Sequence, residues 1–503
     1  MVSGVLSVTL WLPAAGAFLL LFVPRNRVPA IRIVALITVL LDLAASVWAG
    51  VLFDRGHAEV LQLVERVPWI PSLGITYHLG VDGLSLPLVI LTTFLTVLCV
   101  IYSWRVDFRP KEYMILFLLL ETGMVGVFLA LDFFLFYFFW EVSLVPMYFI
   151  IGVWGGPRRA YAAIKFFLYT LAGSLAMLLS ILILYFHSNP RTFDIIGLIQ
   201  QKPLAHDLPL AVLAFWGFFL SFAIKVPMFP FHTWLPDAHV EAPTAGSVIL
   251  AGILLKLGTY GFVRILLPLL PNAFHRMADL VAVLAVVGAV YGAMVAMAQT
   301  DLKKLIAYSS VNHMGYVMLG IAAAAAVDGR SGLSGAAATT LDGATMQMLA
   351  HGVITGALFL LVGVIYDYRA HTRGVKDFGG LGARLPLYAG ITIVTMLGSL
   401  GLPFLMGFVA EFLIFLGAFQ IYPVFTVLAL VGVVITVAYF LWTIQQIFLG
   451  PLNPRWAALP DLDARERWAV VPLVAVMILA GVFPGPLIGV INLAMVNILS
   501  LVR

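Results

Sequence analysis

Long apolar segments recur along this whole sequence, and they constrain its fold more than any other feature. A helix needs about 20 apolar residues to cross the hydrocarbon layer of a bilayer. Backbone polar groups cannot stay unpaired in lipid, so such segments must be helical. The sequence predicts an all-α integral membrane protein with about 14 transmembrane helices. The expected spans lie near 3–23, 30–52, 83–104, 113–131, 133–153, 160–186, 209–230, 244–267, 278–300, 304–326, 343–365, 386–420 (broken), 424–449 and 468–498.

The scarcity of charge supports this class. Only 10% of the 503 residues are charged, whereas a soluble domain has about 25%. The net charge of +4 is small for this length, so we expect the lipid bilayer, and no nucleic acid, as a partner. The only cysteine is Cys99, which argues against Cys-ligated iron–sulfur clusters and Cys-rich zinc sites. No Gly-rich dinucleotide motif follows a predicted strand, so we expect no cofactor in this chain.

Lysine and arginine are distributed unevenly over the loops. Of the 28, 17 lie in loops that follow odd-numbered spans, 8 lie in the opposite loops and termini, and three lie inside spans. Basic loops favour the cytoplasmic side. We therefore expect a multi-pass protein of a prokaryotic plasma (inner) membrane with both termini on the outer side. The residues expected inside are Arg25, Arg27, Arg105, Arg109, Lys111, Arg158, Arg159, Lys303, Lys304, Arg369, Arg373 and Lys376.

Several ionisable residues fall inside the expected spans, where a charge costs about 3 kcal/mol on insertion scales. They are Asp42, Glu121, Glu141, Lys165, Lys225, Lys256, His313, His351 and Glu411. Such groups indicate an ion or proton path, and the alternative is a buried ion pair or a side chain that reaches the interface. That alternative stays open for Asp42, Glu121 and Lys165, which have no helix-breaking proline beside them. We favour function for Glu141, Lys225, Lys256 and Glu411.

Two spans combine a charge with a break. Pro227 and Pro230 follow Lys225 in the seventh span, and Pro403 precedes Glu411 in the twelfth. Proline removes a backbone hydrogen bond, and a broken membrane helix is tolerated where it lines a cavity or packs in protein. Because the broken helices 7 and 12 are five spans apart, we expect two inverted five-helix repeats, a transporter architecture. The expected regions are an N-terminal three-helix region (1–112), the two repeats (113–267 and 278–449) and a C-terminal helix (450–503).

Polar side chains form stripes on two further spans. Ser309, Asn312, His313 and Tyr316 share one helix face, as do Gln347, His351 and Thr355. Histidine titrates near neutral pH and can relay protons. The alternative is a set of interhelical hydrogen bonds.

The pairing of Glu141 with Lys225 has a simple physical interpretation. Burial lowers the pKa of a lysine, and a nearby carboxylate raises it. If Glu141 approaches, Lys225 keeps its proton, and if Glu141 withdraws, Lys225 tends to release it. The sequence leaves open whether the two residues approach each other.

Four residues in the loop after the seventh span also carry metal-binding side chains. They are His232, Asp237, His239 and Glu241. Their spacing matches no helical metal motif, so we expect no metal site.

Several long motifs resemble one known family. They are FHTWLPDAHVEAPT at 231–244, AGSVILAGILLKLG at 245–258, GVDGLS at 80–85, Trp140-Glu141, and DLKKLIAYSSVNH at 301–313. Together these motifs resemble the antiporter-like subunits of respiratory complex I, and among them chain M, also called subunit 4. The resemblance covers essentially the whole chain. Glu411, where sister subunits commonly carry a lysine, and the short sequence after the last span favour chain M.

The resemblance implies a proton-pumping, non-redox subunit of NADH:quinone oxidoreductase in a respiratory chain, coupled to quinone reduction elsewhere in the complex. It implies that Glu141 tunes Lys225, that Lys256 links two half-channels, and that Glu411 ends the outward route. His313 and His351 would belong to the central polar axis. The implied partners are other membrane subunits of complex I, including sister antiporter-like subunits.

Three alternatives remain open. The chain could belong to a multisubunit cation/proton antiporter, which has a similar fold, or to a membrane hydrogenase or a complex with another electron donor. It could also be an inert membrane scaffold.

Overall fold

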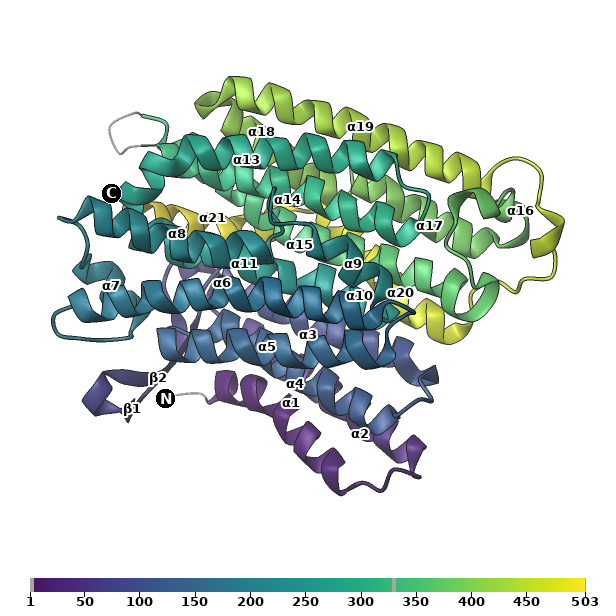
Figure 1. Cartoon of the computed structure of the whole chain (residues 1–503), viewed down its shortest axis with the longest axis horizontal. Coiled ribbons are helices and arrows are strands. Elements are labelled where there is room, and N and C mark those ends of the chain that lie inside the picture. Colours follow the sequence, from purple (N-terminus) through teal and green to yellow (C-terminus); the bar gives the residue numbers. More distant parts are fainter. Residues whose placement is uncertain (1–3, 328–331, 503) are drawn as a thin grey trace.

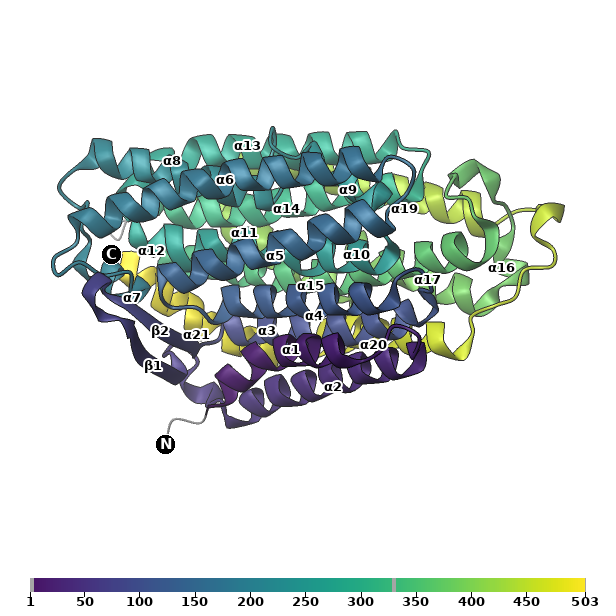
Figure 2. The same cartoon turned by 60° about the horizontal axis from the view of Figure 1, so that its bottom comes forward.

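Long helices run side by side in an elongated bundle, seen from two directions in Figures 1 and 2. The computed structural model describes residues 4–327 and 332–502. The first span is expected to begin at residue 3, the N-terminal region at residue 1, and the C-terminal region is expected to end at residue 503. These three boundaries lie outside the described residues. Within it, twelve helices are long and apolar enough to cross a membrane. Both ends of the described chain lie at the same end of the bundle (Figure 1). The structure is that of a multi-pass membrane protein.

The N-terminal region consists of three helices and a β-hairpin. Its elements are α1 (Val5–Phe22), α2 (Val28–Leu52), β1 (Gln62–Ile70), β2 (Ile75–Val81) and α3 (Ser85–Tyr102). The antiparallel hairpin lies in the connection expected at 53–82 and was not predicted. It covers one end of the bundle (Figure 2), which we call the hairpin end.

The next group of helices occupies the first expected repeat. It comprises α4 (Pro110–Leu129), α5 (Phe133–Trp154), α6 (Arg159–His187), the short α7 (Ile195–Gln201), α8 (Leu208–Lys225), the short α9 (Trp234–Glu241), and a final span, Thr244–Leu269. That last span is irregular: α10 (Thr244–Ile249), α11 (Leu255–Gly261) and α12 (Leu267–Leu269) are separated by the π-helical segments Leu250–Leu254 and Phe262–Leu266.

The second group has the same packing order. It comprises α13 (Pro271–Met297), α14 (Leu302–Ala326), α15 (Ser334–Ile365), the short α16 (Leu381–Arg384), α17 (Pro386–Ser399), α18 (Met406–Ile421) and α19 (Pro423–Phe448). α4 packs on α5 as α13 packs on α14, and α6 packs on α8 as α15 packs on α18. α14 is not among the twelve apolar spans because its polar stripe lowers its hydropathy.

The last expected span, 468–498, is divided into two helices, α20 (Ala464–Val482) and α21 (Gly485–Val502). Pro484 lies between them and cannot donate the backbone hydrogen bond that would continue the first helix. The two helices follow each other along the bundle, from the side of α16 toward the hairpin end (Figure 1).

Acidic side chains begin several of the helices. Asp132, Asp207, Asp301 and Asp463 each accept a backbone N–H of the first helical turn, at 2.8 to 3.0 Å. Such caps satisfy donors that have no partner within the helix. They fix where α5, α8, α14 and α20 begin.

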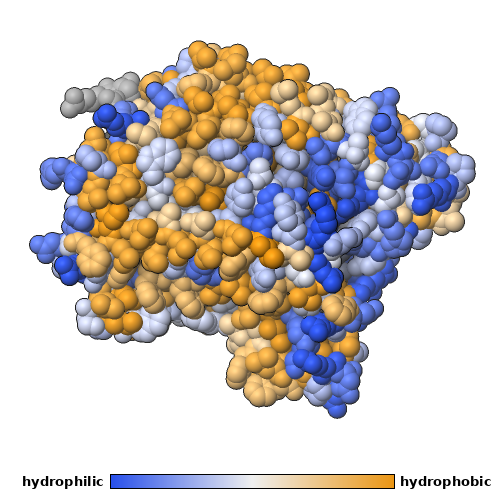
Figure 3. All heavy atoms as spheres, in the orientation of Figure 1, coloured by the Kyte–Doolittle hydropathy of each residue, from blue (hydrophilic) through white to orange (hydrophobic). Residues whose placement is uncertain are grey.

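Basic residues gather at the end of the bundle opposite the hairpin, which we call the basic end. The surface there is hydrophilic, whereas the helices between the two ends are covered with hydrophobic residues (Figure 3). The contacts that join the basic loops are Arg25–Glu112 (2.7 Å), Arg105–Asp463 (2.7 Å), Arg369–Glu466 (2.6 Å) and Arg373–Asp301 (3.1 Å). An apolar belt between polar ends is the surface that a bilayer requires.

Candidate functional site

The six predicted site residues come from six different helices. Lys225, Lys256, His313, His351 and Glu411 are buried, with at most 6% of each residue exposed, and Glu141 is partly buried. The structure brings four of them, Lys256, His351, His313 and Glu411, into one polar series with a single gap between the two histidines.

Lys256 begins the series on α11. Its Nζ lies 2.6 Å from Nδ1 of His351 on α15 and donates to the carbonyl of Ala251 at 2.5 Å. Ala251 belongs to the π-helical segment before α11. π-Helical turns are frequent at functional sites, and here one supplies a carbonyl that holds the lysine ammonium.

His313 and Glu411 form the other end of the series. Nδ1 of His313 on α14 lies 2.9 Å from Oε1 of Glu411 on α18, and Nε2 lies 3.2 Å from the hydroxyl of Ser399. Gln347 on α15 donates to the same carboxylate oxygen at 3.3 Å. The carboxylate is thus held by side chains of two helices.

A small cavity connects the two ends. His313 and His351 both line it, and their ring centroids lie 6.0 Å apart. Its volume of about 10 Å³ is close to the minimum that one water molecule needs. Nε2 of His351 has no hydrogen-bond partner in the described part of the chain. One water in the cavity would give that nitrogen a partner and would join the histidines.

Glu141 and Lys225 lie apart from this series. Lys225 is the last residue of α8, and its ammonium lies over the ring of Trp140, 5.0 Å from the centroid. Among the described residues, neither Lys225 Nζ nor Glu141 Oε1 has a hydrogen-bond partner. The structure therefore shows the two without a direct hydrogen bond.

The break after Lys225 has the expected cause. Pro227 cannot donate to the carbonyl of Ala223, and the N–H of Met228 takes its place at 2.8 Å. The indole of Trp234 donates to the carbonyl of Ile224 at 2.9 Å. The end of α8 is therefore fixed by substitute bonds, which leave Lys225 at the helix terminus.

The other break lies between α17 and α18. Gly401 has a φ of 83° and Phe404 has a φ of 73°, in the region that L-residues rarely adopt. Glycine takes this conformation without steric cost. The turn places Ser399 and Glu411 on opposite sides of the break, both within reach of His313.

The polar stripe on α14 forms hydrogen bonds both to neighbouring helices and within its own helix. Asn312 donates to the carbonyl of Ala289 at 2.6 Å and to the hydroxyl of Tyr316 at 2.9 Å. Ser309 donates to the carbonyl of Ile306 in its own helix at 2.8 Å. Interhelical and intrahelical hydrogen bonds thus account for these polar residues, and His313 alone of the stripe joins the polar series.

The three intramembrane charges whose role the sequence left open have different surroundings in the structure. Lys165 forms an ion pair with Asp237 at 2.7 Å, which agrees with the ion-pair alternative. Asp42 on α2 and Glu121 on α4 are fully buried, and none of their four carboxyl oxygens has a partner among the described residues.

His239 is a buried group whose position the sequence did not indicate. It is fully buried on α9, neither ring nitrogen has a partner in the described residues, and its ring stacks on Phe359 at 4.5 Å. In the sequence, His239 stands out only as a metal-binding side chain and as part of the motif at 231–244. Asp237 pairs with Lys165 and Glu241 with Arg158 (3.6 Å), so the acidic side chains of this loop have different partners.

Comparisons with known proteins agree with this architecture. The family model for NADH:quinone oxidoreductase/Mrp antiporter transmembrane subunits matches residues 130–436. NADH-quinone oxidoreductase subunit M of Rickettsia bellii is 42% identical, over 98% of each chain. Subunit M of Rhodobacter capsulatus is 46% identical, over 96% of this chain and 94% of the relative.

Solved structures have the same fold. A chain of respiratory complex I from Thermus thermophilus with bound NADH superposes with a TM-score of 0.86 at 31% identity, over 98% of this chain and 99% of that one. A chain of an archaeal membrane-bound sulfane sulfur reductase gives a TM-score of 0.82 at 23% identity, over 95% of this chain and 76% of that one, which is evidence of the fold alone. The chain belongs to the antiporter-like subunits of respiratory complex I, as a member of the subunit M family.

Proposed function

We propose that this chain is a proton-translocating membrane subunit of NADH:quinone oxidoreductase and that its buried polar residues carry the proton. The proposed residues are Glu141, Lys225, Lys256, His351, His313 and Glu411. The observation that carries the proposal is the series from Lys256 through His351 and His313 to Glu411. Its members are hydrogen-bonded, except for one gap that has room for a water molecule.

Each group in this series can give or take a proton. Histidine exchanges protons through its two ring nitrogens, so a proton from Lys256 can enter His351 and leave toward the cavity. His313 can accept it there and pass it to Glu411. We propose that Glu411 is the exit side of the route, since it ends the series.

Lys225 and Glu141 are proposed as the entrance of the route. No hydrogen bond joins Lys225 Nζ to Glu141 Oε1 in the described structure. Movement of the carboxylate toward Lys225 would stabilise the ammonium, and movement away would favour proton release. His239, which is fully buried and whose ring nitrogens have no partner among the described residues, is a further candidate for the route.

The energy for transport must come from outside this chain. Moving one proton against 100 mV costs about 2.3 kcal/mol. We propose that quinone reduction in partner subunits supplies this energy and that this chain holds no redox cofactor. The partners would include other membrane subunits, among them sister antiporter-like subunits.

The basic end is proposed to face the cytoplasm of a prokaryotic cell. The bundle would then lie in the plasma membrane with both chain ends outside. A role in a cation/proton antiporter or a membrane hydrogenase is compatible with the fold, but the relatives matched over nearly the whole chain favour complex I.

Replacement of Lys225 by alanine tests the proposal. In the assembled complex in proteoliposomes, we expect NADH:quinone reduction and proton uptake to fall about tenfold or more, a barrier increase of at least about 1.4 kcal/mol. Lys376→Ala, at an exposed position, is the matched control and should leave both rates unchanged. Wild-type rates in Lys225→Ala would contradict the proposal.

A further inference from the structure

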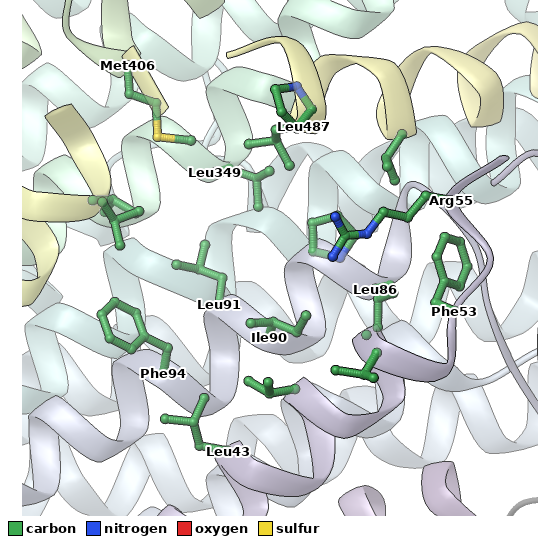
Figure 4. A pocket seen from close by; sticks show the side chains of 18 residues that line it. Leu43, Phe53, Arg55, Leu86, Ile90, Leu91, Phe94, Leu349, Met406 and Leu487 are labelled. Carbon is green, nitrogen blue, oxygen red and sulfur yellow. The ribbon is translucent and has the colours of Figure 1, made fainter. Parts of the chain in front are cut away.

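A groove of about 630 Å³ lies between α2, α3, α15 and the C-terminal helices, away from the polar series (Figure 4). Its walls are almost entirely hydrocarbon. The side chains that form them include Leu43 and Val47 of α2, Ile90 and Phe94 of α3, Leu349 of α15 and Leu487 of α21.

One charged side chain, Arg55, lines this groove in the described structure. It lies in the 3₁₀ turn Arg55–His57 that follows α2, at the hairpin end. Figure 4 shows its guanidinium reaching over Leu86 toward Leu487, into the groove. The neighbouring Asp54 pairs with His57 at 2.8 Å, and no described carboxylate forms an ion pair with Arg55. The guanidinium is therefore available to an anion.

The turn that carries Arg55 is held in place at two points. The N–H of Gly83 donates to the carbonyl of Ala58 at 2.9 Å. Asn497 on α21 donates to the carbonyl of Glu59 at 2.7 Å. These bonds fix the turn between the start of α3 and α21, so Arg55 occupies a built position at the mouth of the groove.

We propose that the groove binds one acyl chain of an anionic phospholipid and that Arg55 binds its phosphate. An empty apolar groove forfeits the dispersion contacts of its lining, and in a bilayer the hydrocarbon that fills it is an acyl chain. Arginine forms strong charge-assisted bonds with phosphate. A phospholipid carries both an acyl chain and a phosphate.

The site is separate from the proposed proton route. Leu349 and Val353 face the groove, and they lie on the side of α15 opposite His351, because two residues along a helix correspond to about 200° of rotation. Substitutions at the groove mouth therefore leave the polar series intact, and failure of one proposal is distinguishable from failure of the other.

Photolabelling of the assembled complex tests the proposal. The probe is phosphatidylglycerol with a diazirine on one acyl chain, in phosphatidylcholine nanodiscs, with the matching phosphatidylcholine probe in parallel. We expect the anionic probe to label α2, α3 and α21 peptides. Labelling should fall about tenfold in Arg55→Gln and also in Val47→Trp, which fills the groove. Arg191→Gln, at another exposed arginine of the loop region, should label as wild type does.

Four results would overturn the proposal. Equal labelling by the two probes, or unchanged labelling in Arg55→Gln, would exclude recognition of the anionic headgroup. Labelling of the purified chain but not of the assembled complex would mean that a neighbouring subunit fills the groove. We expect wild-type NADH:quinone reduction in Arg55→Gln, which would show that the complex assembles. Loss of the complex in both Arg55→Gln and Val47→Trp would contradict a site that only binds lipid.

Discussion

Lys256 and His351 lie 2.6 Å apart although 95 residues separate them in the sequence. Lys256 belongs to the first group of five spans and His351 to the second. Their contact joins a buried polar side chain of one half directly to one of the other half. Any proton that passes from the first half to the second along the proposed route crosses it.

The contact predicts that substitutions at the two positions act as one unit. We expect Lys256→Ala and His351→Ala each to lower coupled quinone reduction about tenfold or more. The double variant should be no slower than the slower single one, because residues in one relay are non-additive. Rates of all four proteins in proteoliposomes give the coupling energy. Additive losses would mean that the two residues act independently.

Glu411 is held by two hydrogen bonds, from His313 and Gln347. Glu411→Gln keeps the volume but cannot carry a negative charge, so we expect proton uptake to fall about tenfold or more while the complex still assembles. Glu411→Asp, which keeps the carboxyl group, should retain more activity. The matched control is Glu112→Gln at the partly exposed pair with Arg25. If Glu411→Gln pumps as the wild type does, Glu411 is not on the route.

The membrane helices were predictable from the sequence because lipid demands about 20 apolar residues per crossing. Most expected spans coincide with one helix or a pair of helices, but the span expected at 244–267 is divided into three α-helical and two π-helical segments. The described residues contain twelve helices long and apolar enough to cross a membrane, so the expected count of 14 is not confirmed. The breaks near Pro227 and Pro403 follow from the missing proline donor. The hairpin was missed because Pro68 and a β-bulge interrupt the alternation of β1.

Side-chain partnerships were much less predictable than helices. Lys165 and Lys225 are both single lysines in apolar spans, and the sequence did not show that Asp237 pairs with Lys165. Arg264 lies near the end of the span expected at 244–267, and in the structure it is a buried partner of Asp82. Such pairs join positions 72 and 182 residues apart, so helix periodicity carries no information about them.

Asp42 and Glu121 are buried carboxyl groups that face each other without a donor in the described structure. Two buried carboxylates at one place cannot both ionise at low cost. We expect Asp42→Asn to stabilise the chain by about 1–3 kcal/mol, because the amide can donate to Glu121 without one of the two carboxyl groups having to stay protonated. The thermal unfolding midpoint in detergent measures the effect, with Asp107→Asn, an exposed position, as the control. A lower midpoint in Asp42→Asn would contradict this prediction.

Asp194 begins α7 at the hairpin end, outside the membrane-spanning helices, and it predicts a dependence of stability on pH. Burial raises the pKa of Asp194, but the hydrogen bonds from His78 and Gly197 and the charge of Arg66 outweigh it and lower the pKa below its ordinary value. The ordinary value of about 3.9 applies to the unfolded chain, which therefore binds the proton more readily. The stabilisation is present above about pH 4 and is lost as the pH falls through the lower, folded-state value.

Acid titration of the unfolding midpoint checks this prediction. In Asp194→Asn we expect a lower midpoint at neutral pH and a shallower fall with acid. Asp207→Asn is the matched control, since Asp207 caps α8 by the same kind of bond, at 3.0 Å, and asparagine caps equally well. Parallel pH curves for wild type and Asp194→Asn would show that this carboxylate contributes nothing.

Asp82 and Arg264 form a buried ion pair between the start of α3 and the π-helical segment after α11. Removal of one member of such a pair costs about 3–5 kcal/mol because a charge stays buried without compensation. We expect Arg264→Met to lower the unfolding midpoint strongly.

The double variant Asp82→Asn/Arg264→Met should recover much of that loss. Asparagine keeps the Oδ1 acceptor that binds the N–H groups of Leu84 (3.0 Å) and Ser85 (3.1 Å), so the cap of α3 survives while the unpaired charge disappears. Unfolding midpoints of the wild type, the two single variants and the double variant in the same detergent measure the recovery. A double variant as unstable as the sum of the single ones would show that the loss comes from packing of the arginine side chain and not from the charge left on Asp82.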